Sequence, residues 1–154
     1  MELRVCAEDP AAGFVPQVGT IASWREPADI RVDTAIESGM AVSPFYDSML
    51  AKYLAWAPTR EACIGKLTLA CERSTLLGIR SNLAFLSQAI NHPTFRQGGV
   101  TTAFLGTEDV CAGYWATKPG AYAEAAAALT LGGLADAPAT LRPADGRHRA
   151  CLAG

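Results

Sequence analysis

Residues 2–10 read ELRVCAEDP, a stretch in which apolar and polar side chains alternate. Alternation with a period of two is typical of a strand that buries one face. Leu3 and Val5 are therefore expected to face the core, and Arg4 to point to the opposite side. Residues 8–13 (EDPAAG) follow as a turn. The pattern thus places an arginine on the outer face of a short first strand.

Working outward from this strand, short extended segments separated by glycine and proline fill the first third of the chain. Alternation and the residues that precede proline predict extended structure within 14–16, 20–24, 30–34, 40–42 and 49–56. The last segment is rich in large apolar residues around one lysine, Lys52. It could form a strand or a short helix, and we favour an extended core segment.

Two helices are predicted after these strands. Residues 59–72 begin with Thr59 as N-cap and carry Glu61 in the first turn, where the helix dipole favours an acid. A short strand or connector at 76–79 leads to a second helix, which Ser81 is expected to cap. The sequence therefore predicts an α+β fold, a small antiparallel sheet with packed helices. The apolar positions of the two helices are Ile64, Leu67, Ala70, Cys71, Leu83, Leu86 and Ile90.

The composition changes after residue 105. We expect one domain over residues 1–106 and an extension over 107–154 that contains a linker, an alanine-rich helix at 121–131 and a poorly ordered tail. The tail is rich in glycine, proline and alanine and has lost its hydrophobic periodicity.

The whole-chain composition excludes several classes of function. The 154 residues have a net charge of −2 without clusters of Lys or Arg, which disfavours nucleic-acid binding. The sequence contains neither an apolar run of membrane-spanning length nor a signal peptide, so we expect a cytoplasmic protein with no membrane partner. Its five cysteines show no CxxC spacing, so no metal site is predicted.

Several short motifs of the sequence, taken together, resemble a known family. Read in order, ELRVCAEDP, RVD, VSPFYDSMLAK, TREA, GIRSN and TTAFL resemble the C-terminal domain of biotin carboxylase over roughly residues 2–105. Each piece alone is a weak signal, but the ordered set with sensible spacing is specific. Within the family, the acyl-CoA carboxylases of the methylcrotonyl-, geranyl- and propionyl-CoA type look closest.

The resemblance implies a reaction and a site. In the family, ATP and bicarbonate form carboxyphosphate, and the resulting carbon dioxide is taken up by the enolate of biotin. Arg4 matches the family's catalytic, biotin-binding arginine, and Asp47 in Tyr46-Asp47-Ser48-Met49 matches the acid that accompanies it. A permanently charged guanidinium suits an oxyanion that develops on the ureido ring. The alternative is that Arg4 and Asp47 form an ordinary surface ion pair.

Other residues of the resembling segments are interpreted structurally. We expect Phe45 and Tyr46 to pack in the core. Lys52 either pairs with a carboxylate or, as we favour, lays its stem along an apolar surface. Arg31 aligns with a subunit-interface position of the bacterial acetyl-CoA carboxylase type, although its neighbours differ from that pattern.

The resemblance also implies what this chain lacks. ATP and Mg belong to an ATP-grasp portion upstream of these motifs, no P-loop replaces it, and the biotin-accepting lysine motif is absent, so biotin would reside on another domain or chain. We therefore expect a fragment of an ATP-dependent ligase, inactive alone. Its expected partners are the ATP-grasp portion, a biotin carboxyl carrier domain and a carboxyltransferase subunit. The alternatives are a non-catalytic interaction module that pairs with a separate carboxylase chain, and a fragment of urea carboxylase.

Overall fold

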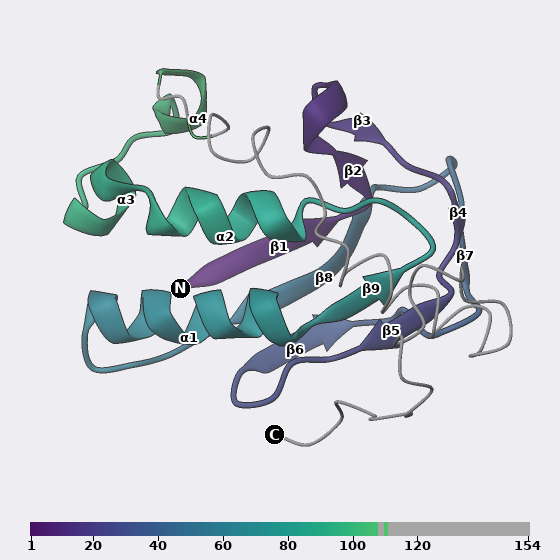
Figure 1. Cartoon of the computed structure of the whole chain (residues 1–154), viewed down its shortest axis with the longest axis horizontal. Helices are drawn as coiled ribbons and strands as arrows, with labels where there is room; N and C mark the ends of the chain where they lie inside the picture. Colours follow the sequence, from purple (N-terminus) through teal and green to yellow (C-terminus); the bar gives the residue numbers. More distant parts are fainter. Residues whose placement is uncertain (108–109, 111–154) are drawn as a thin grey trace, which may run out of the picture. The chain divides into compact units, whose positions relative to one another are not determined.

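A three-stranded antiparallel sheet forms the centre of the fold. In the computed structural model, which describes residues 1–107 and 110, β8 (Met49–Leu54) lies between β1 (Glu2–Cys6) and β6 (Arg31–Thr34) (Figure 1). The alternation in β1 is realised as predicted, because Leu3 and Val5 are buried while Glu2 and Arg4 are exposed. A register shift between Val5 and Cys6 bends the end of β1 where it meets the start of β8.

Three separate two-stranded sheets accompany the central sheet in the described residues. β2 (Glu8–Asp9) pairs with β3 (Val15–Pro16), β4 (Gly19–Thr20) with β7 (Ala41–Val42), and β5 (Ser23–Arg25) with β9 (Thr75–Leu77); a single 3₁₀ turn, η1 (Pro10–Ala12), follows β2. The single strand predicted at 20–24 is thus two strands. The reason is a change of partner, since the amide of Ile21 donates to Met40 and the amide of Ala22 donates to Leu77.

The two predicted helices are present, and two short ones follow. They are α1 (Arg60–Arg73), α2 (Leu83–Asn91), α3 (Pro93–Gln97) and α4 (Phe104–Thr107). Thr59 caps α1 as predicted, with its hydroxyl accepting from the amide of Ala62 at 3.2 Å. The predicted cap of α2 is wrong: Asn82, not Ser81, holds the N-cap position, and its side chain makes no capping bond because it binds β1 instead.

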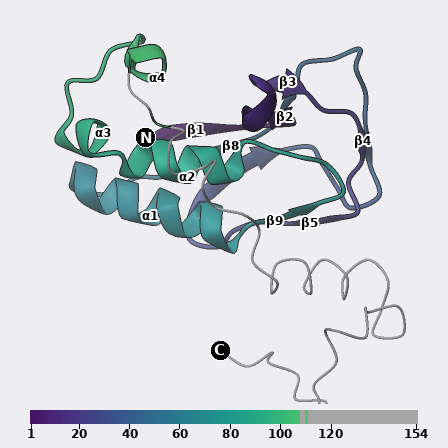
Figure 2. The same cartoon turned by 45° about the horizontal axis from the view of Figure 1, so that its top comes forward.

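The main core lies between the helices and one face of the sheet. α1 and α2 run side by side and cover the same face of β1 and β8 (Figures 1 and 2). Their contacts bury Val5, Tyr53, Ile64, Leu67 and Ile90 almost completely. Burial also raises the pKa of the Tyr53 hydroxyl to about 12, and that hydroxyl lies 2.7 Å from the Ser74 hydroxyl. On the opposite face of the sheet, Glu2, Arg4, Arg31 and Asp33 are exposed.

The α+β prediction with a small antiparallel sheet is therefore confirmed. The predicted alanine-rich helix at 121–131 and the tail that follows it lie outside the described residues. Within residues 1–107, no helix has the length and apolar character needed to cross a membrane.

Gly78 is required where β9 ends. Its φ is +102°, and an added Cβ would lie 2.3 Å from the carbonyl oxygen of Thr20 and 2.5 Å from the amide nitrogen of Ala22. No side chain fits this approach between backbones. Gly78 thereby allows the segment 79–82 to return toward β1.

We predict that Gly78→Ala lowers the free energy of unfolding by about 2 kcal/mol or more, because backbone atoms must move apart. Gly65→Ala is the matched control, since Gly65 is an exposed helical residue with open space around its Cα. That change should raise the free energy of unfolding by about 0.5–1 kcal/mol. Urea denaturation measures both, and equal effects of the two substitutions would contradict the assignment.

Candidate functional site

The candidate site lies on the face of the central sheet that the helices leave uncovered. We call this surface, made by Glu2, Arg4, Arg31, Asp33 and Lys52, the open face. The strand register places Arg4 opposite Lys52 and Lys52 opposite Asp33, so these three residues form one row across β1, β8 and β6. The next row carries Glu2, Leu54 and Arg31. Charged side chains from three strands are therefore neighbours on one surface.

Each arginine of the open face is held by a carboxylate two residues away on its own strand. The Nε of Arg4 donates to Glu2 at 3.2 Å, and Arg31 donates to both carboxylate oxygens of Asp33 at 2.8 and 2.9 Å. The Arg31 guanidinium accordingly lowers the pKa of Asp33. Residues i and i+2 of a strand share a face, which makes these pairs local. The pair fixes the Arg4 side chain while 69% of it stays exposed.

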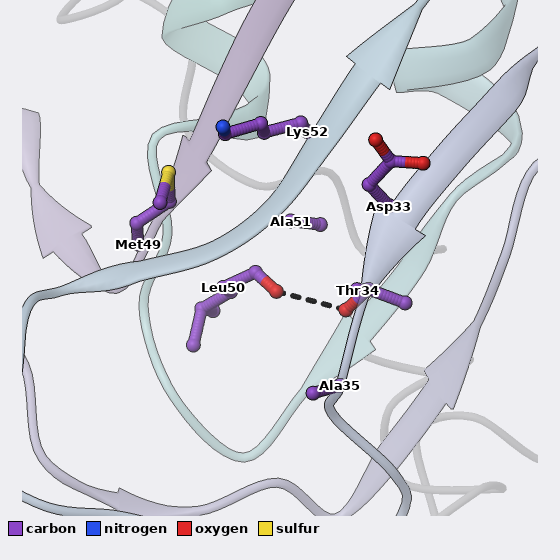
Figure 3. A pocket seen from close by; sticks show the side chains of 7 residues that line it. All are labelled: Asp33, Thr34, Ala35, Met49, Leu50, Ala51 and Lys52. Atoms are coloured by element: carbon purple, nitrogen blue, oxygen red, sulfur yellow. Dashed lines mark hydrogen bonds between the residues drawn. The ribbon is translucent and has the colours of Figure 1, made fainter.

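Lys52 differs from the two arginines. Among the described residues it forms no ion pair, and Figure 3 shows its ammonium extending toward β1 and away from the Asp33 carboxylate. The neighbouring cations Arg4 and Lys52 are thus on the same side of the sheet. Of the two interpretations of Lys52 from sequence, pairing with a carboxylate is not observed in residues 1–107.

An open hollow of about 320 Å³ lies beside Lys52 (Figure 3). The hydroxyl of Thr34 donates to the carbonyl of Leu50 at 2.8 Å and ties β6 to β8 at its wall. The hollow has both a cation and an acid at its rim, so it can accommodate a polar group. It is lined by Asp33, Thr34, Ala35, Met49, Leu50, Ala51 and Lys52.

The pKa of the Cys6 thiol depends on the charged residues at the end of β1. Burial has the largest effect on the pKa of the thiol and raises it, and the Glu8 carboxylate raises it further. Of the smaller effects, the Ser48 hydroxyl lowers the pKa, the Asp47 carboxylate raises it and the Arg4 guanidinium lowers it. Arg4 and Asp47 therefore act on the same sulfur atom. Ser48 also donates to Glu8 at 2.6 Å, which joins the start of β8 to β2.

Comparison with known proteins shows the family of the domain that carries this surface. Residues 2–107 match the family described as "Biotin carboxylase C-terminal domain". The chain belongs to this family. The biotin carboxylase C-terminal domain is thus the part of the chain that carries both the open face and the helices behind it.

Relatives of the domain are biotin-dependent carboxylases. The propionyl-CoA carboxylase alpha chain of Ruegeria pomeroyi is 36% identical over 130 residues, covering 70% of this chain and 19% of its own length. The biotin carboxylase of Halalkalibacterium halodurans is 42% identical over 107 residues, covering 68% of this chain and 24% of its own length. A pyruvate carboxylase chain of Methanothermobacter thermautotrophicus is 33% identical over 107 residues, covering 68% of this chain and 22% of its own length.

Solved structures show the same fold. The biotin carboxylase domain of the Hydrogenobacter thermophilus 2-oxoglutarate carboxylase, in complex with MgADP, ADP and bicarbonate, superposes with a TM-score of 0.67 at 36% identity. The match covers 68% of this chain and 24% of that structure. The chain thus spans about a quarter of the biotin carboxylase to which it is similar.

The structure brings the two predicted site residues near one another but not into contact. Arg4 pairs with Glu2, while a carboxylate oxygen of Asp47 accepts from the amide of Met49 at 3.0 Å. Among the described residues, Arg4 and Asp47 form no ion pair. Glu2, rather than Asp47, therefore holds the rotamer of Arg4. The biotin-binding role of Arg4 and Asp47 stays a prediction.

Sequence reasoning missed several residues of this site. Glu2 had a usable signal, because it stands two positions before Arg4 on the same strand face. Asn82 stands in the GIRSN motif, but no local pattern indicated its contact, since its side chain binds the backbone of β1 from 76 to 78 residues away. Arg80 likewise reaches Asp9 across 71 residues, at 2.6 Å.

The expectation that Phe45 and Tyr46 pack in the core is wrong. Their side chains are 88% and 85% exposed. They stand in the turn between β7 and β8, which is closed by two local bonds: the Ser43 hydroxyl accepts from the amide of Phe45, and Asp47 accepts from that of Met49. These two bonds hold the turn without any contact from the aromatic rings, so both rings stay exposed.

The Cys6 thiol offers a test of the charge arrangement. We predict that Glu8→Gln and Asp47→Asn each lower the apparent pKa of Cys6, because a lost negative charge stabilises the thiolate, and that Glu8→Gln has the larger effect. Arg4→Gln should raise it. The measurement is the rate of alkylation against pH, in a background where Cys111 and Cys151 are replaced by serine. Alkylation profiles that coincide for all variants would contradict the proximity of these groups.

Proposed function

We propose that this chain contributes the biotin-binding side of the site for ATP-dependent carboxylation of biotin in an acyl-CoA carboxylase. The observation that carries the proposal is the Arg4 guanidinium, exposed on the open face and braced by Glu2, in a chain that belongs to the biotin carboxylase C-terminal domain family. A braced cation with free donors is what an oxyanion-stabilising group requires.

The geometry of Arg4 fits the ureido group of biotin. Its Nε is used by Glu2, and within residues 1–107 its two terminal nitrogens have no hydrogen-bond partner. They belong to a side chain that is 69% exposed, and they can donate together to one carbonyl oxygen. Biotin, when bound, supplies the ring nitrogen that is carboxylated. Arg4 stabilises the negative charge that develops on the ureido oxygen, and Asp47 contributes a second, negative charge nearby.

The remaining chemistry requires the rest of a biotin carboxylase. The Hydrogenobacter structure that resembles this chain contains MgADP and bicarbonate, and this chain matches only 24% of it. We propose that ATP, Mg and bicarbonate are bound by a separate ATP-grasp portion, which faces the open face. The further partners are a biotin carboxyl carrier domain and a carboxyltransferase subunit.

We also propose that the acceptor of the carboxyl group is an acyl-CoA. This proposal is supported by the relatedness to propionyl-CoA and methylcrotonoyl-CoA carboxylase chains. Pyruvate and 2-oxoglutarate carboxylases are related as well, so the acceptor is best decided by the neighbouring genes. A carboxyltransferase gene supports acyl-CoA, whereas an amidase gene supports urea.

Exposed aromatic rings favour a protein partner at the turn before β8. Phe45 and Tyr46 are almost fully exposed, and Trp56 at the other end of β8 is 79% exposed. Aromatic side chains that are exposed next to one another, as Phe45 and Tyr46 are, are typical of a surface that a protein partner covers. We propose that the ATP-grasp portion covers them in the complete enzyme.

A hybrid enzyme tests the function. In the hybrid, this chain replaces the matching quarter of the Halalkalibacterium biotin carboxylase, its relative at 42% identity. We expect biotin-dependent ATP cleavage, and Arg4→Gln should lower its kcat about a hundredfold, because an oxyanion-stabilising donor is lost. ADP release measured with and without biotin gives the result.

Arg25→Gln is the matched control for this test. Arg25 is an exposed strand arginine, but it lies on β5 in another ladder and should leave the biotin response unchanged. The proposal fails if the hybrid cleaves ATP without any response to biotin, or if Arg4→Gln behaves like the control.

The exposed rings predict self-association of the isolated chain. We expect sedimentation velocity to show dimers or larger species, and the double change Phe45→Ser and Tyr46→Ser to shift the chain toward monomer, because the exposed apolar area decreases. Leu69→Ser, at an exposed position of α1, is the control. A wild-type chain that sediments as a uniform monomer rules out this role for the rings.

A further inference from the structure

The strand that carries Arg4 lies at an edge of the central sheet. β8 pairs with one side of β1, and no strand pairs with the other side within the described residues. The backbone groups on a free edge need partners and leave the strand free to shift. The position of Arg4 therefore depends on what binds this edge.

In the part of the chain that the structure describes, the side chain of Asn82 occupies the edge next to Arg4. The Oδ1 of Asn82 accepts from the amide of Cys6 at 2.9 Å, and its Nδ2 donates to the carbonyl of Arg4 at 3.1 Å. The backbone amide of Asn82 donates in turn to the carbonyl of Cys6 at 3.1 Å. Asn82 is 6% exposed, so its carboxamide is shielded from water.

The carboxamide reproduces what a neighbouring strand would supply. It offers one acceptor and one donor side by side, which a carboxylate or a hydroxyl of similar size does not. Asn82 stands at the N-cap position of α2, but its side chain makes no capping hydrogen bond, because it binds β1. The edge contact has thus replaced a local bond that would have stabilised the helix.

The same short segment also holds the turn after β1. Arg80 Nη1 lies 2.6 Å from Asp9 Oδ2, and Asp9 is itself buried while it accepts from the amide of Ala11. Residues 80–82 therefore form hydrogen bonds with Arg4, Cys6 and Asp9. The start of this segment is placed by the tight approach at Gly78.

We propose that Asn82 is a positioning residue for Arg4, which clamps the free edge of β1 so that the guanidinium is presented at a fixed place on the open face. The role in catalysis rests on the proposed function of Arg4. The clamp itself does not, and it is measured separately.

Hydrogen exchange of the 154-residue chain tests the clamp. In Asn82→Ala, the Cys6 amide loses its acceptor, and we expect its exchange to become about tenfold faster or more relative to wild type. Asn82→Asp keeps an acceptor for Cys6 but loses the donor to Arg4, so Cys6 should stay better protected than in Asn82→Ala. If Asn82→Ala does not fold, Asn82→Ser carries the same measurements.

Asn91→Ala is the matched control. Asn91 lies on the same helix and also makes several side-chain bonds, to Thr68, Ser87 and Arg96, but none to β1. Its loss should affect stability without selective exposure of the Cys6 amide. Equal exchange at Cys6 in Asn82→Ala and in wild type would overturn the clamp.

The hybrid enzyme tests positioning. The ratio of biotin-dependent to biotin-independent ATP cleavage should fall about tenfold in Asn82→Ala, less in Asn82→Asp, and not in Asn91→Ala. A faster Cys6 exchange with an unchanged ratio overturns the positioning role, as does an equal fall in Asn91→Ala. A wild-type hybrid without a biotin response instead overturns the proposed function, and the catalytic role of Asn82 with it, while the exchange result still decides the clamp.

Discussion

The antiparallel pairing of β1 with β8 is the contact on which both the core and the candidate site depend. Its register sets Leu3 opposite Tyr53 on the face covered by the helices and Arg4 opposite Lys52 on the open face. A slip of one residue would turn Arg4 into the core and Leu3 into water, because the side chains of a strand alternate. The buried side chains therefore also fix where the arginine points.

The charges of the open face follow from this register. Two cations stand directly opposite one another at Arg4 and Lys52, an arrangement that is unfavourable by itself. The nearby acids are already engaged, Glu2 by Arg4 and Asp33 by Arg31. A surface that keeps unpaired positive charge between engaged acids is suited to an anionic or strongly polar ligand.

The parts of the fold with local causes could be predicted from the sequence. The alternation of Leu3, Arg4 and Val5 and the cap at Thr59 were confirmed, because each depends on neighbours within a few residues. The predictions failed where distant segments compete. Asn82, and not Ser81, occupies the N-cap position of α2, and its side chain binds β1. Phe45 and Tyr46 are exposed because hydrogen bonds within their own turn hold it, such as the bond from the Phe45 amide to the Ser43 hydroxyl.

The sequence by itself determined that a strand near the start of the chain presents Arg4 away from the core, and its ordered words indicated the family. Only the tertiary structure decided what surrounds Arg4 beyond its own strand: Lys52 opposite it on β8 and Asn82 at the free edge of β1. The physical reason is range. Period and capping depend on adjacent residues, whereas the contact between Arg4 and Asn82 spans 78 positions and exists only after β9 and α2 have packed against the sheet.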